Sequence, residues 1–386
     1  MVSVVVTGIG LVCALGESLE YSWKQLIAGK SGINRHQPFP ALESLPLGLI
    51  GTQPANIRML TQLVVASALA DAQLVPPLPD CGVVIGSSRS FQADWEEMAR
   101  QMEVGEKGSR GVGEKNIQLW LDTLPHMNAI ATAQQIGASG VVLAPMAACA
   151  TGIWAIAQAV NLVQTGVCER VIAGAVEAPI SPLTITGFKQ MQALAQTGAY
   201  PFDLRRSGFV LGEGAAVFVL ESAQLAASRQ AKVYGQILGF GLTADAYHAY
   251  APQPEGRSAI AAVRQCLDRS HLTPSDIDYI HAHGTGTQLN DSVESLVIQR
   301  IFPQRIPVSS TKGATGHTLG ASGALGVAFS LMALRHQILP PTVGLLHPEF
   351  DLELVRTASG SKIRNVLSFS FGFGGQNAAI AFCHKS

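Results

Sequence analysis

Short runs of β-branched residues alternate with alanine-rich stretches along the whole chain. The apolar runs are bounded by glycine or polar residues, a pattern that predicts buried strands. We expect strands at residues 4–6, 83–85, 171–173, 215–220, 233–238, 278–282, 305–308, 363–370 and 378–382. We expect helices at residues 61–72, 151–165, 258–269 and 320–335, the second of them stopped by Gly166. This alternation predicts an α/β fold.

The alternation restarts after residue 232, and no Pro/Ser-rich linker separates the two parts. We therefore expect two closely packed α/β halves, residues 1–232 and 233–386. The two most irregular stretches, residues 34–54 and 105–116, predict surface loops or cap elements.

Composition excludes several classes of protein. Of the 386 residues, 47% are hydrophobic and 14% are charged, which is unlike a disordered chain. A net charge of −1 without Lys/Arg clusters argues against a nucleic-acid binder. The N-terminus has no signal-peptide pattern, and no apolar stretch reaches the roughly 20 residues that span a bilayer. The six cysteines lack the spacing of a disulfide framework or a metal site, so we expect no metal. Together these features predict a soluble cytoplasmic protein.

Cys149 lies in the stretch AACATG, residues 147–152, between an apolar strand and an alanine-rich helix. A cysteine at a helix start feels the positive end of the helix dipole, which predicts a lowered thiol pKa and a reactive thiolate. A buried cysteine packed at a strand–helix junction explains the position equally well. Position alone leaves both interpretations open.

Two histidines follow predicted strands in turns rich in glycine and threonine. His283 lies in HAHGTGT, residues 281–287, where no GKS or GKT follows and a phosphate-binding P-loop is therefore unsupported. For His281, two residues earlier, a packed or surface position is favoured. His317 ends the segment SSTKGATGH, residues 309–317, in which Lys312 lies at the other end of the turn.

A further segment, SFGFGGQN at residues 370–377, alternates glycine with aromatic residues. Glycine lets the backbone N–H groups approach a ligand, so an oxyanion hole is one interpretation. A β-bulge or hairpin turn with two core phenylalanines is the other.

The order and content of these segments resemble the β-ketoacyl-acyl carrier protein synthases, the decarboxylating condensing enzymes of the thiolase superfamily, and most closely the synthase II type. The resemblance covers nearly the whole chain and includes VVTGIG (5–10), YPFD (200–203), GFVLGEG (208–214) and DAYH (245–248). It implies a five-layered αβαβα sandwich of two similar halves. The N-terminal half would carry the nucleophile with the cap and dimer elements, and the C-terminal half both active-site histidines.

The resemblance also implies roles for individual residues. Cys149 matches the nucleophile, His283 and His317 the two active-site histidines, and Lys312 the lysine of the third motif. Phe373 matches the aromatic gate, and the backbone N–H groups of Cys149 and Phe373 would form the oxyanion hole. The further substrate-binding positions are Thr285 and Thr287, along the pantetheine arm, and Phe371 and Gly374. Asp291 and Glu294 are expected to hold the histidine loop rather than to touch substrate.

The implied reaction moves an acyl group from a carrier-protein thioester to Cys149 and then condenses it with malonyl-acyl carrier protein, with loss of carbon dioxide. No metal, nucleotide or flavin is expected. The expected partners are acyl carrier protein and a second copy of the chain, or a related subunit in a heterodimer. We expect a basic patch with Arg205 and Arg206 to meet the carrier, and Phe188 and Ile153 to influence acyl chain length.

Three features depart from the family pattern. Gly326 stands where these synthases commonly carry a glutamate that pairs with the lysine, and Gln376 stands where a threonine is usual. The early loop and the stretch at 105–116 are shorter than is typical. These departures suggest a specialised pathway, such as secondary metabolism, rather than housekeeping elongation.

Three alternatives remain. A chain-length-factor-like partner subunit typically lacks the cysteine that this chain keeps. A malonyl-carrier decarboxylase or acyltransferase would perform half of the cycle, and the missing glutamate favours it. A degradative thiolase would need a second cysteine near the C-terminus, but Cys383 lies in the last predicted strand, where packing explains it better.

Overall fold

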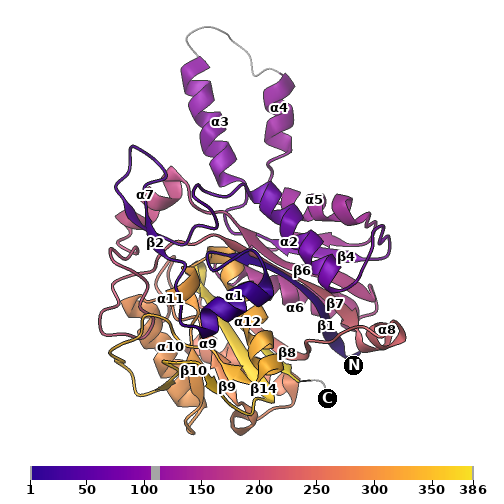
Figure 1. Ribbon diagram of the computed structural model, residues 1–386, viewed down its shortest axis with the longest axis vertical. Coiled ribbons are helices and arrows are strands. Elements are labelled where there is room, and N and C mark those ends of the chain that lie inside the picture. The colour runs from indigo at the N-terminus through magenta and orange to yellow at the C-terminus, as the bar shows by residue number, and fades with distance from the viewer. Residues whose placement is uncertain (1, 106–113, 385–386) are drawn as a thin grey trace.

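A mixed sheet of eleven strands runs through the computed structural model, which describes residues 2–105 and 114–384 (Figure 1). The strand order is β12-β10-β9-β14-β15-β8-β1-β7-β6-β4-β5. The strands are β1 (Val4–Cys13), β4 (Gly82–Gly86), β5 (Val142–Leu143), β6 (Arg170–Glu177), β7 (Gly214–Ser222), β8 (Gly235–Ala244), β9 (Tyr279–His281), β10 (Pro307–Ser309), β12 (Glu353–Leu354), β14 (Asn365–Gly372) and β15 (Gln376–Cys383).

The sheet consists of two parts with the same pairing order. Strands β1, β7 and β6 pair antiparallel, and β4 and β5 then continue in parallel. In the second part β8, β15 and β14 pair antiparallel, and β9 and β10 continue in parallel. The two parts join where residues 4–6 of β1 pair with β8. The repeated order agrees with two similar halves, and their boundary at residues 232 and 233 stays a prediction.

Helices form three layers around the two parts of the sheet (Figure 1). Helices α2 (Ile57–Asp71) and α5 (Met127–Ile136) pack on the first part, and α9 (Arg257–Ser270) packs on the second with α10 (Gln288–Ile301) beside it. Helices α6 (Thr151–Gln164) and α12 (Ser322–His336) pack on each other in the middle. Helix α12 is buried from Ser322 to Leu334, which explains why its sequence has no polar face. The predicted αβαβα sandwich is confirmed.

All of the predicted strands and helices overlap an observed element. The main differences lie at the ends, because caps and pairing partners set them. Strand β1 continues to Cys13 along β7, and α2 begins at Ile57 because the Asn56 side chain accepts the N–H of Met59. Strand β9 ends at His281, which leaves His283 in the following turn.

Two helices that were not predicted lie at the two ends of residues 105–116, the stretch predicted as a surface loop or cap element. Helices α3 (Gln92–Gly105) and α4 (Glu114–Leu121) project from the body of the protein (Figure 1), and residues 106–113 of that prediction lie outside the described residues. Residues 34–54 contain a short hairpin. The remaining elements are α1 (Leu19–Ile27), β2 (Asn34–His36), β3 (Leu45–Leu47), α7 (Pro182–Gln190), α8 (Ala223–Ser228), α11 (Lys312–Thr315), β11 (Ile338–Leu339), β13 (Ser359–Gly360) and 3-10 turns at Pro274–Asp276, Leu319–Ala321 and Phe373–Gly375.

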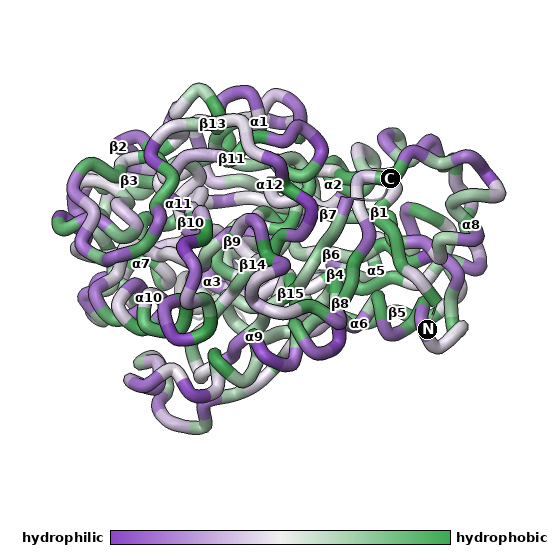
Figure 2. Tube along the Cα trace, turned by 90° about the horizontal axis from the view of Figure 1, so that it is seen from below, coloured by the Kyte–Doolittle hydropathy of each residue, from purple (hydrophilic) through white to green (hydrophobic). Residues whose placement is uncertain are grey.

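Hydrophobic residues follow the central strands. Figure 2 shows green segments along β1, β4 and β15, with many purple segments in the loops around them. Within the described residues, no helix has the length and apolar character needed to cross a membrane.

Candidate active site

Cys149 sits in a tight turn just before α6. Ala148 has a φ of +47°, a left-handed conformation that is uncommon for a residue with a side chain. The Thr151 hydroxyl fixes the turn, because it accepts the N–H of Ala147 at 2.9 Å and donates to the carbonyl of Ala148 at 2.6 Å. The turn therefore holds Cys149 in one orientation at the end of the central helix layer.

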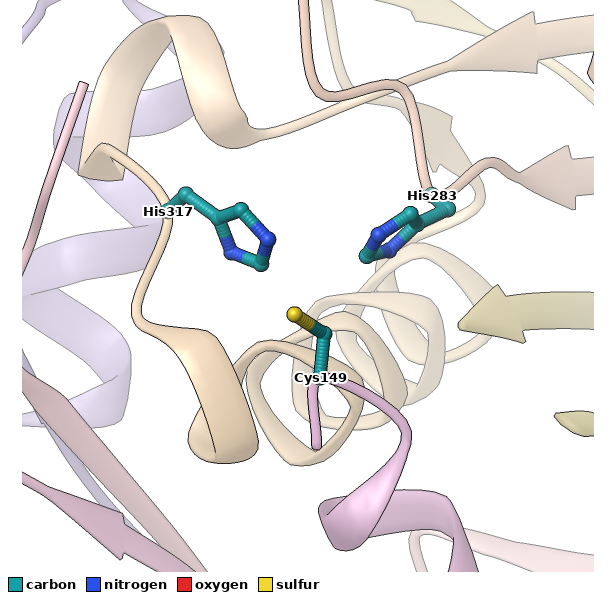
Figure 3. Close-up of side chains that lie close together, drawn as sticks. All are labelled: Cys149, His283 and His317. Carbon is teal, nitrogen blue, oxygen red and sulfur yellow. The ribbon is translucent and has the colours of Figure 1, made fainter. Parts of the chain in front are cut away.

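The structure brings Cys149 together with both predicted histidines. One sulfur or ring-nitrogen atom from each of Cys149, His283 and His317 lies within 4.8 Å of the other two. Figure 3 shows the thiol pointing between the two imidazoles, which come from separate loops of the C-terminal half. The imidazole centroids are 5.3 Å apart with the ring planes at 80°. A small group placed at the sulfur would thus face two ring edges.

Two buried carboxylates hold the His283 loop against α10. Glu294 accepts the backbone N–H groups of His283 and Gly284, each at 2.6 Å. Asp291 accepts the N–H of Thr285 at 3.0 Å. Both acids are fully buried, so the expectation that they hold the loop agrees with these contacts.

Lys312 is buried beside His283, and no carboxylate among the described side chains pairs with it. Its ammonium donates to the carbonyl of His283 and lies 3.3 Å from Nδ1 of the same residue. Burial lowers the pKa of Lys312 to about 8, and the charge of Glu294 opposes this shift. Lys312 is therefore mostly protonated at pH 7. An ammonium only donates, so Nδ1 of His283 acts as the acceptor and its Nε2 carries the hydrogen.

Both imidazoles are neutral at pH 7. Burial lowers the pKa of His283 and of His317 well below the ordinary value, and the charge of Lys312 adds to the effect at both. Nδ1 of His317 lies 2.8 Å from the hydroxyl of Ser322, a partner that the sequence did not identify.

The predicted lowering of the Cys149 pKa is wrong. Burial raises the pKa of the thiol to about 11, against the lowering effects of Lys312, the Phe373 N–H and Arg89. The sequence correctly placed the cysteine before a helix, but desolvation of the thiolate outweighs the favourable groups. The resting nucleophile is a thiol.

The glycine-rich end of β14 lies directly against the cysteine turn. A Cβ atom at Gly372 would lie 2.9 Å from the backbone nitrogen of Cys149, so only glycine allows this approach. The approach brings the Phe373 N–H to the thiol. Gly374 has a φ of +76° and its N–H donates to the carbonyl of Ala249 at 2.8 Å, which fixes the loop.

A cavity of about 240 Å³ opens onto the three residues. Of the predicted site residues, the cavity is lined by Cys149, His283, His317, Thr285, Thr287, Phe371 and Phe373, whereas Lys312 and Gly374 do not line it. Phe188 also lines it, but Ile153 is buried inside α6 and does not. The sequence missed Phe209, Tyr250 and Leu319, because their positions give no signal without the fold.

The predicted basic patch is wrong for Arg206. Its side chain is buried and pairs with Glu349. Arg205 pairs with Asp203 and stacks over the ring of Tyr200 at 4.5 Å. Arg206 is thus committed to internal contacts and cannot meet a partner's acidic helix.

His281 is packed, as expected, and explains one departure from the family pattern. The ring is buried, with Nε2 3.2 Å from the hydroxyl of Thr311 and Nδ1 without a partner. A Cβ atom at Gly326 would lie 2.8 Å from both Cε1 and Nδ1 of His281. The imidazole therefore takes the space that a side chain at position 326 would need.

Comparison with protein families matches both halves of the chain. Residues 55–226 match the family model described as "Beta-ketoacyl synthase, N-terminal domain", and residues 234–346 match "Beta-ketoacyl synthase, C-terminal domain". A putative mitochondrial 3-oxoacyl-[acyl-carrier-protein] synthase of Schizosaccharomyces pombe is 34% identical, over 99% of each chain. The 3-oxoacyl-[acyl-carrier-protein] synthase 2 of Synechocystis sp. is 36% identical over 98% of this chain and 97% of its own.

Solved structures of related proteins superpose over the whole chain. A type II PKS ketosynthase structure, described as an acyl-carrier protein in complex with its ketosynthase bound to the hexaketide, has a TM-score of 0.93 at 26% identity and full coverage of both chains. A β-ketoacyl synthase from Burkholderia phymatum has a TM-score of 0.91 at 28% identity, also with full coverage of both chains.

Proposed function

Because the chain belongs to the β-ketoacyl synthase family, we propose that Cys149 carries an acyl group that is condensed with malonyl-acyl carrier protein to a β-ketoacyl product. The chain is a condensing acyltransferase that resembles the synthase II type. The roles of these residues are assigned from one observation: the thiol of Cys149 and the neutral imidazoles of His283 and His317 lie within 4.8 Å of one another. The product would enter fatty acid or polyketide-type biosynthesis.

The first half-reaction exchanges one thioester for another. The sulfur of Cys149 attacks the acyl carbonyl, the bond to the carrier's pantetheine sulfur breaks, and the thiol proton ends on that sulfur. The oxyanion of the tetrahedral intermediate is held by the backbone N–H groups of Cys149 and Phe373. This role is supported by the contact of the Phe373 N–H with the thiol and by the close approach of Gly372.

The second half-reaction uses the imidazoles as hydrogen-bond donors. The Nε2–H groups of His283 and His317 bind the malonyl thioester oxygen and stabilise the enolate as carbon dioxide leaves. The α-carbon then attacks the acyl-Cys149 carbonyl, and the Cys149 thiolate leaves and takes up a proton. For His283 the contact with Lys312 supports this tautomer, and for His317 a hydroxyl hydrogen donated by Ser322 would give the same result. Lys312 is thus a positioning residue.

The other pocket residues bind the substrates. Thr285 and Thr287, whose hydroxyls lie 2.9 Å apart at the pocket, would contact the pantetheine arm. Phe371 lies 6.1 Å from the His283 ring, and Phe373 acts as the gate beside it. Gly374 does not line the pocket, and its hydrogen bond to the carbonyl of Ala249 would hold the loop of Phe373 beside it.

No cofactor is required for this chemistry, because decarboxylation supplies the driving force. The donor types of Cys149, His283 and His317 would also suit Zn²⁺. The ammonium of Lys312, 3.3 Å from a ring nitrogen of His283, places a positive charge beside these donors and disfavours a dication. The substrates would arrive on the phosphopantetheine of acyl carrier protein.

A homodimer is the proposed assembly. The edge strand β5 has no neighbour on its outer side among the described residues, and such edges pair readily with another copy. Large apolar side chains are also exposed on α4, on β5 and just after β5. They are Ile117, Leu119, Trp120, Leu121, Leu143 and Met146. Free cysteines throughout the described chain support the expected reducing, cytoplasmic setting.

One alternative function is supported by a specific observation. No carboxylate of the described part of the chain lies within 4.0 Å of the Lys312 ammonium, so the second candidate is a half-cycle enzyme that only transfers acyl groups or decarboxylates malonyl-carrier protein. A chain-length-factor-like subunit is disfavoured by the assembled Cys149 and histidines.

Intact-protein mass spectrometry separates these functions. Wild type and Cys149→Ala are incubated with acyl-carrier protein and then chased with malonyl-carrier protein. An acyl adduct confined to the wild type that converts to β-ketoacyl-carrier protein supports condensation. An adduct followed only by decarboxylation or hydrolysis supports the half-cycle enzyme, and the absence of any adduct rejects the role of Cys149.

A further inference from the structure

An arginine packs on the wall of the acyl pocket. The guanidinium carbon of Arg89 lies 5.2 Å from the centroid of the Phe188 ring. Phe188 lines the cavity, and its ring contacts Phe209 at 5.1 Å and Phe373 at 6.2 Å between centroids. The positive charge is close enough to favour the thiolate of Cys149. Arg89 therefore packs on Phe188 from outside the cavity and is not itself one of the residues that line it.

The backbone of Arg89 is fixed to the same wall. Its N–H donates to the buried carboxylate of Glu177 at 3.0 Å. The other oxygen of Glu177 accepts the N–H of Gly320 at 3.0 Å, next to Leu319, which lines the cavity. One carboxylate thus ties the loop of Arg89 to the loop that carries His317.

Arg89 is half-buried, and its guanidinium has no protein acceptor among residues 2–101 and 117–384, whose side chains the structure describes. No carboxylate there lies within 4.0 Å of its nitrogens, and its five N–H donors make no hydrogen bond with the described protein atoms. Other arginines of comparable or greater burial are paired, namely Arg170 and Arg229 with Glu221, and Arg206 with Glu349. None of the unpaired side-chain nitrogens of Arg89 is fully buried, so water satisfies these donors in the free protein and a ligand oxygen can replace that water.

We infer that Arg89 selects acyl groups that carry oxygen acceptors, a carboxylate or a ketone, at the end remote from the thioester. This inference rests on the proposed role of Cys149 as the acyl carrier. The rings of Phe188 and Phe209 accommodate the apolar part of the chain, and an acyl group that displaces the Phe188 ring meets the guanidinium next. A saturated chain reaches the same point with a methyl group, which displaces water from the guanidinium without supplying an acceptor.

Three carrier-bound acyl groups of equal length test the inference: hexanoyl, 5-oxohexanoyl and adipoyl. They differ only at the distal end, which is a methyl group, a methyl ketone or a carboxylate. The initial rate of adduct formation on Cys149 is measured by intact-protein mass spectrometry for wild type, Arg89→Met and Arg89→Lys. Lys189→Met is the matched control, because Lys189 follows Phe188 but is exposed and pairs with Glu43.

In wild type, we expect adipoyl or 5-oxohexanoyl to react about tenfold faster than hexanoyl, as one hydrogen bond to a charged group allows. Arg89→Met removes this preference, and Arg89→Lys retains it for the carboxylate. Lys189→Met keeps the wild-type ratios. Faster reaction with 5-oxohexanoyl than with adipoyl would indicate that the natural acyl chain carries a ketone. Faster reaction with adipoyl would indicate that it carries a second carboxylate.

Two results overturn the inference, and they differ from a failure of the proposed function. Wild type that reacts fastest with hexanoyl rejects the selection of oxygenated chains. An oxygenated-to-hexanoyl ratio that is the same in wild type and in folded Arg89→Met rejects the role of Arg89. If none of the three acyl groups forms an adduct on wild type, the acyl-carrying role of Cys149 fails instead.

Discussion

Replacing Lys312 by methionine should make the protein more stable and less active. The pKa of Lys312 is about 8 in the folded protein, against an ordinary value of 10.5. Keeping the ammonium buried at pH 7 therefore costs on the order of 3 kcal/mol, because one pKa unit corresponds to about 1.4 kcal/mol. Loss of the hydrogen bond to the His283 carbonyl offsets about 1 kcal/mol of the gain. We expect the free energy of unfolding of Lys312→Met at pH 7 to rise by about 2 kcal/mol.

The stability difference between Lys312→Met and wild type depends on pH. Below pH 8 the lysine is protonated in the folded and in the unfolded chain, so the cost in wild type is complete. Between pH 8 and about 10.5 the folded protein loses the proton first, and the cost disappears. The stability difference between variant and wild type should therefore shrink over this range. Equilibrium urea unfolding at pH 7, 9 and 10.5, at one protein concentration, measures it.

The activity of Lys312→Met tests the role of Lys312 in the mechanism. Without the ammonium, Nδ1 of His283 loses its donor, and decarboxylation of malonyl-carrier protein should fall by about tenfold to a hundredfold. Acylation of Cys149 should fall less. A variant that is less stable than wild type at pH 7, with a difference that does not change up to pH 10.5, would refute the electrostatic reasoning. Unchanged decarboxylation would refute the positioning role.

Three further predictions concern neighbouring groups. Ser322→Ala removes the hydroxyl that lies beside Nδ1 of His317 and should lower the turnover number for decarboxylation about tenfold with little change in KM. Ser322→Thr should restore part of the turnover number. Equal effects of Ser322→Ala on the turnover number and on KM would contradict this prediction. Gly326→Ala should lower the free energy of unfolding by about 1–3 kcal/mol, because its Cβ meets the His281 ring, and His281→Asn should relieve most of the loss in a double-mutant cycle; additive effects would exclude the contact. The rate of Cys149 alkylation by iodoacetamide should rise continuously from pH 7 towards pH 11, because burial raises the thiol pKa; a plateau reached below pH 8 would show a stable thiolate instead.

The fold could be predicted because its signals are local. Each buried strand is a short apolar run bounded by turn residues, and each central helix is a longer run of small apolar residues. The projecting helix α3 was not predicted because its sequence is predominantly polar. Helix α4 was not predicted because it is only 8 residues long, although Ile117, Trp120 and Leu121 recur at helical spacing. Element ends differed wherever a cap such as Asn56 or a distant strand set them.

The candidate site could be predicted only in part, because burial is a property of the fold. The segments around Cys149, His283 and His317 identify which residues meet, and the structure places them together. The sequence could not give the sign of the Cys149 pKa shift, which depends on how far the turn lies from solvent. It also suggested that Arg206 faces a partner, whereas the fold buries that side chain against Glu349. The sequence also could not show that His281 excludes a side chain at position 326, because the two residues are 45 positions apart and make contact only in the fold.

The charge state of the site connects the stability of the protein to its chemistry. In the resting enzyme the thiol and both imidazoles are neutral, and the buried Lys312 carries a positive charge that no carboxylate of residues 2–101 and 117–384 contacts. Each chemical step creates a negative charge in the same space, first as the thiolate and the oxyanion and then as the enolate. A fixed positive charge in a buried site stabilises these states more than it stabilises the neutral thioesters. The charge that costs stability in the resting protein is therefore an interaction that becomes favourable in the transition states.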